Sequence, residues 1–356
     1  MQHEWGMPLS GSSADEVIRS VVRLVQKHGV SRESDGGLEV RELLGVSTVL
    51  TNPRARLFVS ERHPEIFNPG LAVARFFYLI SGSHELDAIT FYSPAARRFS
   101  DDGLVMPGGS HGFRLFYPSP ATDQVESLLR MLREHPERNR SAVAIYRPDD
   151  CGSPSVDLTC VMGALFTCKG GRFHTLVNMR ANDALRLMWY DLFEFSMLSE
   201  YISAQCGFAL GKYYHSSFVM MLIGRHALRA AENVVSEVAR SPVMDQMPTV
   251  GPETRRHLIQ RERALRSCVA SIPFNEFRRL LDALAREEEP YWADLMVALA
   301  LQGRYANTEP RTASCEADFL EIPNHMTVAS QALENSVRIL EMRVGGAPAE
   351  PRGAGC

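Results

Sequence analysis

The sequence predicts a mixed α/β fold with an added helical region at its C-terminal end. Strand-like runs of β-branched and aromatic residues alternate with helix-like segments as far as His226. Beyond that residue the chain turns into charged, Arg- and Glu-rich segments whose apolar residues keep helical spacing. With 356 residues and an apolar fraction of 45%, the chain can bury a substantial core in one large domain or two ordinary ones.

The N-terminal pattern predicts a helix, a polar connector, two short strands and a buried helix. The segments are a helix over residues 14–29, a connector from Ser31 to Gly37, strands over Ser47–Leu50 and Arg56–Val59 around a turn at Thr51–Arg54, and a helix over Leu71–Ile80 that ends at Ser81-Gly82. Arg75 interrupts this otherwise almost wholly apolar helix. The following segment, Ser93 to Pro120, is rich in proline and glycine, and we expect a loop that contains His111.

The middle of the chain predicts a β-hairpin that carries Cys160. An amphipathic helix with apolar spacing at residues 125–132 and a strand at residues 142–146 come first. Two strand-like runs, Val156–Met162 and Phe173–Arg180, are then joined through Gly170-Gly171, a pair typical of a two-residue turn. In such a ladder, residues whose numbers sum to about 341 face each other.

This register places Cys160 opposite Ala181 and beside Arg180, and we expect the guanidinium to lower the pKa of the thiol. In a regular ladder the two side chains point to opposite faces, so a β-bulge is needed to bring them together. Asp183 follows, and Asp191 lies in an apolar helix predicted over 184–204. Taken singly, these residues fit an inert core thiol, a strand end, a helix cap and a satisfied buried carboxylate.

Composition excludes several classes of protein. The formal net charge of −4 gives no basic excess, which argues against a nucleic acid polymer as partner and favours a small phosphorylated ligand held by a few arginines. The seven cysteines are scattered and never in C-x-x-C spacing, so we expect reduced thiols, no metal site and a cytoplasmic protein. We find no signal-like N-terminus and no apolar run of the roughly 18 residues that span a membrane.

Read together, these segments resemble the thymidylate synthase family. The matching segments are Asp123-Gln124 (family D-Q), His135–Val143 (N-P-x-S-R-R), Leu158–Val161 (L-P-P-C-H), Met179–Asp183 (Q-R-S-x-D), Met188–Asp191 (L-P-F-N) and Gly211–His215 (G-x-F). The intervals from Cys160 to Arg180 and to Asp191 are kept without gaps. The resemblance is clear over residues 120–226, weaker over 45–115, and fades beyond His226.

The resemblance implies a thymidylate-synthase-like fold, a large twisted sheet covered by helices on one face and forming a homodimer through the other. We expect a catalytic core over residues 1–235, a helical extension packed on it over 236–345, and a flexible tail over 346–356. The apolar tail that closes over folate in the family has no counterpart at Pro351–Cys356.

The resemblance also implies chemistry. The Cys160 thiolate adds to C6 of a pyrimidine nucleoside monophosphate, which lets C5 attack the one-carbon donor 5,10-methylenetetrahydrofolate. The implied substrate-binding residues are Arg180, Arg138, Ala181, Asp183, Arg54 or Arg56, and Arg140 reaching in from a second subunit to complete the phosphate site. Asp183 and Tyr190 are the implied contacts to folate.

Asp191 is the sharpest departure from thymidylate synthases, which carry asparagine there. A carboxylate accepts from the 4-amino group of cytosine, and the resemblance then points to the cytidylate hydroxymethylases, in which water adds to the methylene intermediate. Ala181 replaces a phosphate-binding serine, while Met221 and Ile223 replace the pair that holds the deoxyribose. These changes favour CMP over dCMP, as in enzymes of nucleoside-antibiotic biosynthesis.

Arg75 falls where the family places a catalytic glutamate, so Glu85 or His111 is expected to take part in proton transfer. His111 aligns roughly with the family's tyrosine near the thiol. A plain loop position is the alternative for each. Two further functions stay open: a uridylate or deoxyuridylate C5-methylase, and a noncatalytic nucleotide-binding protein on the same fold.

Overall fold

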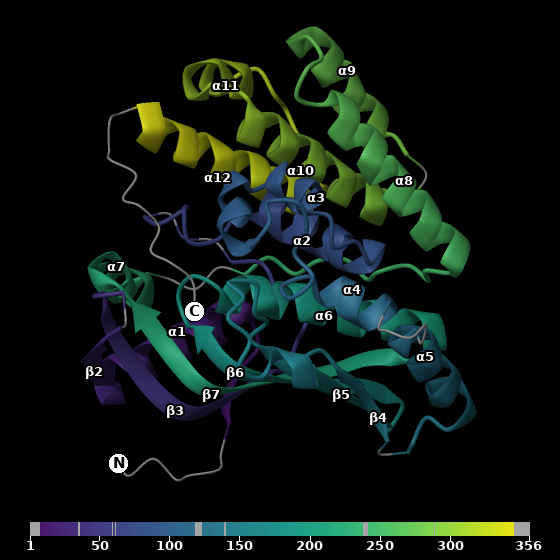
Figure 1. The fold of residues 1–356 in the computed structure, drawn as a ribbon. Helices are drawn as coiled ribbons and strands as arrows, with labels where there is room; N and C mark the ends of the chain where they lie inside the picture. Colours follow the sequence, from purple (N-terminus) through teal and green to yellow (C-terminus); the bar gives the residue numbers. More distant parts are fainter. Residues whose placement is uncertain are drawn as a thin grey trace.

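The computed structural model describes residues 8–34, 36–58, 60, 62–117, 123–138, 140–237, 241–287 and 289–344. Within this part of the chain, one curved sheet forms the base of the molecule, helices cover one of its faces, and a second layer of helices lies above them (Figure 1). The predicted α/β class and the helical C-terminal region are confirmed.

Among the described residues, the sheet has seven strands in the order β1-β3-β7-β6-β5-β4. Strand β2 pairs with the first residues of β3, and β1 with its last residues. The strands are β1 (Leu9–Gly11), β2 (Val30–Glu33), β3 (Glu39–Leu50), β4 (Ser141–Ala144), β5 (Val161–Lys169), β6 (Arg172–Asp183) and β7 (Ala209–Ile223). The central β6 pairs antiparallel with β5 and parallel with β7. Strand β6 is therefore paired on both sides as far as Met179, and its last residues, Ala181 to Asp183, pair with β7.

The predicted β5–β6 hairpin is confirmed. Gly170 and Gly171 have φ angles of 58° and 71°, the left-handed conformation that a type I′ turn requires at both central positions. Pairs whose numbers sum to 341 run from Lys169↔Arg172 to Gly163↔Asn178. Beyond Gly163 the register shifts by one residue, and Val161 faces Met179. A β-bulge thus lies where the hairpin approaches Cys160.

Within the described part of the chain, eight helical segments precede β7, and the longest of them, α6, is buried. They are α1 (Ala14–His28), α2 (Pro69–Ser81), α3 (Leu86–Thr90), η1 (Pro94–Phe99), α4 (His111–Phe116), α5 (Gln124–Glu134), η2 (Pro148–Asp150) and α6 (Met188–Cys206). Every residue of α6 from Met188 to Ser203 is buried, because β6 and β7 contact one side of it and α2 and α5 contact others. Carboxylates on α6 must therefore find partners inside the protein.

Four sequence predictions need correction. Residues Val156 to Cys160 form a loop rather than a strand, because the Asp157 carboxylate accepts the backbone N–H groups of Gly108 and Gly109. Ser31 begins no connector: residues 31–33 continue β2, which pairs with β3.

The predicted strand at Arg56 also fails. Leu57 and Phe58 have no strand partner, and the Phe58 ring stacks on Trp189 at 3.5 Å between centroids; Val59 lies outside the described residues. The predicted loop over Ser93–Pro120 contains η1 and α4, and its last three residues lie outside the described part.

The C-terminal helices, except the first of them, form the outer layer (Figure 1). They are α7 (Arg225–Ser236), α8 (Pro252–Cys268), α9 (Phe274–Ala285), α10 (Pro290–Asn307), α11 (Pro310–Ala317) and α12 (Thr327–Val344). Helix α7 packs on α1 and β7, whereas α8, α10 and α12 contact α2. The domain division at 235/236 stays a prediction, and the expected tail over 346–356 lies outside the described residues.

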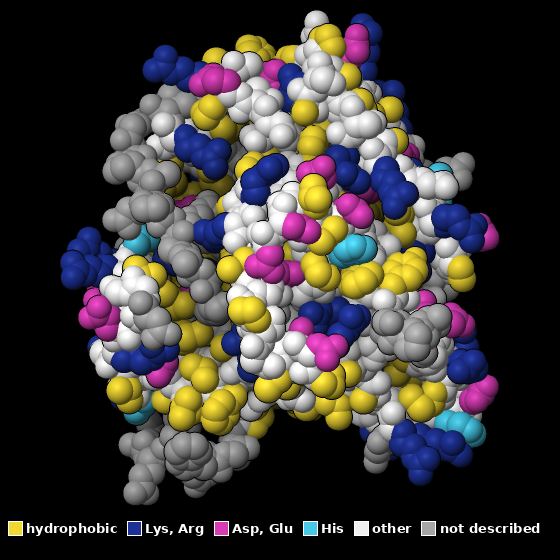
Figure 2. All heavy atoms as spheres, viewed as in Figure 1, with side chains coloured by type: hydrophobic (Ala, Val, Ile, Leu, Met, Phe, Trp, Pro, Cys, Tyr) yellow, Lys and Arg dark blue, Asp and Glu magenta, His cyan; other side chains and the backbone are white. Residues whose placement is uncertain are grey.

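The opposite face of the sheet carries no helix in Figure 1, and hydrophobic side chains gather along this side of the molecule in Figure 2. Leu165 on β5 and Phe218 on β7 are 46% and 66% exposed there. Among the described helices, none is long and apolar enough to cross a membrane.

Candidate active site

Cys160 lies where the chain enters β5, opposite Arg180 on β6. The backbone N–H of Arg180 donates to the Cys160 carbonyl oxygen at 2.9 Å, and its Nε donates to the Thr159 carbonyl oxygen at 3.0 Å. The predicted register placed Cys160 opposite Ala181, and the β-bulge moves it by one residue. Because cross-strand partners point to the same face, the bulge brings the thiol and the guanidinium together.

The expected depressed pKa of Cys160 is wrong for the unliganded chain. Burial raises the pKa of the thiol, the Arg180 guanidinium lowers it, and the Asp191 carboxylate raises it, with a net shift above the ordinary value. The side chain packs against the apolar core, so loss of hydration outweighs the neighbouring cation. The raised pKa favours the thiol over the thiolate.

Asp191 and Glu194 lie one turn apart on α6 and share one cation from α2. Arg75 Nη2 lies 3.3 Å from Asp191 Oδ1, and Arg75 Nε lies 3.0 Å from Glu194 Oε2. His111, on the first turn of α4, places Nδ1 2.7 Å from Glu194 Oε1. The side chains of Asp191 and Glu194 are 6% and 5% exposed and that of Arg75 is 26% exposed, so two buried carboxylates share a half-buried cation.

The two carboxylates have pKa values that move apart. Burial raises the pKa of Asp191 to about 6, with Arg75 opposing this shift and Glu194 adding to it. Burial also opposes ionisation of Glu194, but Arg75 and His111 lower its pKa below the ordinary value. Glu194 is consequently the more firmly ionised of the pair. Such divergence between neighbouring carboxylates is typical of acid–base sites.

A second chain of polar groups reaches Asp191 from the sheet. Asn182 Nδ2 lies 3.0 Å from Asp191 Oδ2 and 3.0 Å from His215 Nε2, and His215 Nδ1 lies 3.2 Å from the Tyr213 hydroxyl. Burial lowers the pKa of His215 to about 4, so the ring is neutral and its Nε2 accepts from the amide. Asp191 is therefore fixed by Arg75 on one oxygen and Asn182 on the other.

Other predicted site residues lie around this network. Asp183 Oδ1 accepts the backbone N–H groups of Leu185 and Arg186, both at 2.9 Å, and caps the turn before α6. The Tyr190 hydroxyl accepts the Asn68 backbone N–H at 3.0 Å, and the Arg75 guanidinium lies 5.4 Å from the Tyr190 ring centroid.

The three residues noted as departures at the phosphate and sugar positions come together in space. Ala181, Met221 and Ile223 form a small apolar cluster with Val40. None of these three side chains can donate or accept a strong hydrogen bond.

The arginines proposed for phosphate binding separate into two groups. Arg54 Nε lies 2.7 Å from Glu200 Oε1, and Arg56 pairs with the other oxygen of the same carboxylate. The Arg56 side chain is 0% exposed and already neutralises a buried charge on α6, so Arg56 is not available to a ligand in this structure. Arg138 and Arg140 are exposed and precede the edge strand β4.

Sequence inspection missed Glu194, Asn182 and His215. Glu194 follows Asp191 by three residues in an apolar helix, so both side chains share one face of it. That spacing, together with Arg75 as the one charged residue in another apolar helix, could have indicated a buried ion pair. Glu85, by contrast, is exposed at the start of α3 and takes no part in the network.

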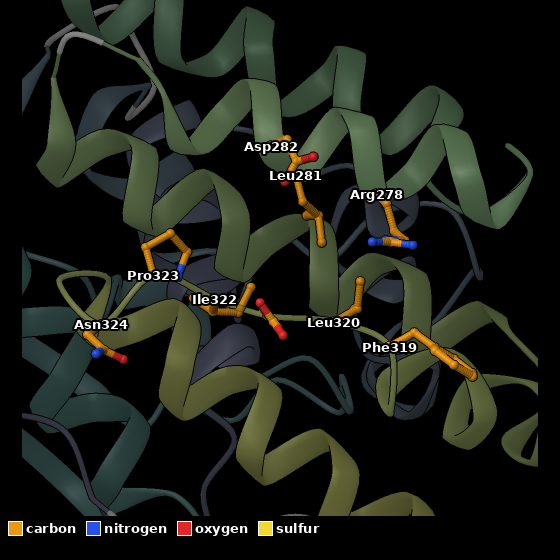
Figure 3. A pocket seen from close by; sticks show the side chains of 9 residues that line it. Arg278, Leu281, Asp282, Phe319, Leu320, Ile322, Pro323 and Asn324 are labelled. Carbon is orange, nitrogen blue, oxygen red and sulfur yellow. The ribbon is translucent and has the colours of Figure 1, made fainter.

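A separate cavity of about 480 Å³ lies in the helical layer, between α9 and the segment before α12 (Figure 3). Arg278, Leu281 and Asp282 line it from α9, opposite residues 319–324. None of the site residues above contributes to it. Among the described residues, no group of three or more His, Cys, Asp or Glu side chains is arranged to hold a metal ion.

Comparison with known proteins gives consistent neighbours. Residues 82–256 match the family model described as thymidylate synthase, a range that includes Cys160, Asp191 and Glu194 but not Arg75. The chain is 29% identical over 118 residues to thymidylate synthase of Bacillus subtilis subsp. natto, covering 32% of this chain and 41% of that protein. It is 28% identical over 213 residues to deoxyuridylate hydroxymethyltransferase of Delftia phage PhiW-14, covering 56% of each.

The chain thus spans about half the length of the curated relatives it matches. Among solved structures, thermostable thymidylate synthase A from Bacillus subtilis superposes with a TM-score of 0.54 at 18% identity, over 64% of this chain and 86% of that one. The predicted thymidylate-synthase-like fold is therefore confirmed.

Proposed function

We propose that this chain, whose residues 82–256 match the thymidylate synthase family model, transfers a one-carbon unit from 5,10-methylenetetrahydrofolate to C5 of a pyrimidine nucleoside monophosphate. The finer proposal is a cytidylate 5-hydroxymethyltransferase that prefers CMP to dCMP. The observation that carries it is the buried Asp191 carboxylate, held from two sides by Arg75 and Asn182 and acting electrostatically on the Cys160 thiol.

Cys160 is the proposed nucleophile. Its thiolate adds to C6 of the pyrimidine, and C5 then carries the electron pair that attacks the methylene carbon of the folate. Arg180 donates hydrogen bonds to the carbonyl oxygens of Thr159 and Cys160, so its charge stays beside the sulfur as the thiolate forms. The same guanidinium is the proposed ligand of the nucleotide phosphate.

Asp191 is the proposed reader of the base. A carboxylate offers only acceptors, and the 4-amino group of cytosine offers donors, whereas the 4-oxygen of uracil does not. The network holds Asp191 in place before substrate arrives, which reduces the cost of ordering it. With uracil, the 4-oxygen would face the carboxylate as acceptor against acceptor, which makes the wrong base costly.

The apolar cluster of Ala181, Met221 and Ile223 supports a remodelled phosphate and sugar site. Ala181 has no hydroxyl to give to a phosphate, and neither Met221 nor Ile223 can bond a sugar hydroxyl. A ribonucleotide, with its extra 2′-hydroxyl, is the proposed occupant. A place in nucleoside-antibiotic biosynthesis stays part of this proposal.

A uridylate substrate is the second candidate, and one contact favours it. Arg75 Nη2 lies 3.3 Å from Asp191 Oδ1, so the pair presents a donor beside an acceptor, as an asparagine amide does. One relative named above is a deoxyuridylate hydroxymethyltransferase. A methylase product, or binding without turnover, are the remaining alternatives.

We further propose a homodimer formed through the open face of the sheet. Leu165 and Phe218 are exposed on this face, and Arg138 and Arg140 are exposed at its β4 edge. An apolar face of this kind is typical of a subunit interface. In the proposed dimer, Arg140 completes the phosphate site of the partner subunit.

Release of tritium from C5 tests the reaction and its substrate together. Addition of the thiolate to C6 labilises the C5 hydrogen, so [5-³H]CMP, dCMP, UMP and dUMP are each incubated with the protein, with and without 5,10-methylenetetrahydrofolate. Fastest release from CMP is expected. Release only from the uracil nucleotides would establish the second candidate, and release from none would leave a binding protein.

A further inference from the structure

Glu194 orients the imidazole ring of His111. His111 is 9% exposed, and its Nδ1 is held at 2.7 Å by Glu194 Oε1. The other carboxylate oxygen is held at 3.0 Å by Arg75 Nε. The Phe195 ring centroid lies 5.2 Å from that of His111 and limits movement of the imidazole. The carboxylate thus orients the ring by a bond to one nitrogen and leaves Nε2 for a ligand.

The direction of this bond sets the chemistry of the imidazole. An ionised carboxylate only accepts, so His111 Nδ1 carries the proton and donates to Glu194. In the neutral ring Nε2 then has a lone pair and can act as a base. Arg75 keeps Glu194 ionised by facing it directly, in agreement with the lowered pKa of this carboxylate. This is the arrangement in which an acid residue orients a catalytic histidine.

Other candidate bases near Asp191 are already engaged. His215 is 1% exposed and uses both nitrogens, one toward Asn182 and one toward the Tyr213 hydroxyl. Tyr213 is fully buried, and burial raises its pKa well above the ordinary value. Asp191 itself is occupied by Arg75 and Asn182. Among these groups, His111 is the one with a nitrogen left for substrate.

We propose that His111 Nε2 removes the C5 proton of the nucleotide and that Glu194 and Arg75 are positioning residues for this base. The inference rests on the proposed one-carbon transfer and adds the proton-transfer group to it. The proposal also gives Arg75 a role. Arg75 on α2 falls where the resemblance places a glutamate. In this chain the carboxylate is Glu194 on α6, and Arg75 orients it.

The step balances without any further reagent. After C5 has bonded to the methylene carbon, His111 Nε2 takes the C5 proton, and the C–H electron pair forms the exocyclic double bond as the folate nitrogen leaves with the electron pair of the broken C–N bond and takes up a proton. Water then adds to the exocyclic carbon and gives up a proton, and electrons return to the ring. Expulsion of the Cys160 thiolate from C6 restores the pyrimidine.

The test uses a nucleotide that stops before this step. 5-Fluoro-CMP accepts the thiolate and the one-carbon unit but has no C5 proton to lose, so a covalent adduct with protein and folate accumulates and is seen by intact mass. His111→Gln and Glu194→Gln are expected to form this adduct like the wild type. With CMP, His111→Gln is expected to lose about 100-fold or more in kcat, the usual range for a general base, with little change in KM.

Glu194→Gln is expected to lose kcat in the same way, and Glu194→Asp to regain part of it, which a purely structural role does not predict. Glu316→Gln is the matched control, because Glu316 is a buried carboxylate that pairs with Arg304 at 2.6 Å in the helical layer. It should match Glu194→Gln in melting temperature change while keeping kcat.

The outcomes separate the two proposals. If the wild type forms no adduct with 5-fluoro-CMP or 5-fluoro-UMP, the proposed function fails. If the wild type forms the adduct and His111→Gln or Glu194→Gln keeps wild-type kcat, the function stands and this inference is overturned. Loss of the adduct in folded variants would also overturn it, because the pair would then act before proton removal.

Discussion

Arg180 donates its backbone N–H to the Cys160 carbonyl oxygen at 2.9 Å, which places a cationic residue beside the cysteine of the Leu158–Val161 segment. The thiol nevertheless has a raised pKa, because burial outweighs the arginine. The thiol is therefore favoured over the thiolate at Cys160.

Replacing Cys160 by alanine should abolish tritium release from [5-³H]CMP, because no other group in the described site can add to C6. Cys151→Ala is the control, since Cys151 is an exposed free thiol outside the site. Retained turnover in Cys160→Ala would remove the nucleophile from the account.

Replacing Arg180 by alanine should weaken nucleotide binding. A charge-assisted hydrogen bond contributes about 1.5–3 kcal/mol, so KM for CMP should rise by about 10- to 100-fold. The corresponding nucleoside, cytidine, lacks the phosphate and should show no such difference in binding between wild type and variant. A change of equal size for both ligands would mean that Arg180 acts only on local structure.

Asp191→Asn should move selectivity from cytosine toward uracil. The amide keeps the shape of the side chain but can donate to O4, so the ratio of tritium release from CMP to that from UMP should fall on the order of 100-fold or more. An unchanged ratio would mean that Asp191 does not read the base. Both nucleotides are measured at several concentrations to separate binding from turnover.

The same variant should change the pH dependence of stability. Burial raises the pKa of Asp191 from 3.8 to about 6, so the native state binds more protons than the unfolded state in this window. The Asp191 contribution to stability is therefore lost as the pH rises from about 4 to 7, by an amount on the order of 2–3 kcal/mol. Denaturant unfolding at several pH values measures it: the stability of Asp191→Asn relative to wild type should rise between about pH 4 and 7, and a relative stability that falls with rising pH would contradict the assignment.

Mixing two inactive variants tests the proposed dimer. Cys160→Ala lacks the nucleophile, and Arg140→Ala lacks the arginine proposed to act on the partner subunit. A mixed dimer has one site in which Cys160 and a partner arginine are both intact, so activity should return on mixing after denaturation and refolding. No recovery, with dimers seen by sedimentation, would place Arg140 outside the partner's site.

Local patterns predicted much of the fold. The apolar spacing of α1, α2 and α5 and the Gly170-Gly171 turn depend on neighbours in sequence, and each is found as predicted. The β-bulge before Gly163 was not predictable, because it depends on Met162, whose carbonyl oxygen accepts from both Ile145 and Tyr146 beyond the end of β4.

The candidate site shows the same division. Cys160, Arg180 and Asp191 are predicted from the family resemblance, whereas Glu194 pairs with Arg75, more than a hundred residues earlier in the chain. The expected phosphate-binding role of Arg56 does not hold, because Arg56 pairs with the buried Glu200. That partner is also more than a hundred residues away, so the sequence gives no sign of it. Pairings between remote charged residues leave no periodic signal, and packing decides them.

The central claim is best tested by the product formed from CMP and 5,10-methylenetetrahydrofolate, identified by mass spectrometry together with the folate that is released. The account predicts a cytidylate heavier by one CH₂O unit, tetrahydrofolate as co-product, and no product from Cys160→Ala. A nucleotide heavier by one CH₂ unit with dihydrofolate, or turnover of uracil nucleotides only, would contradict it.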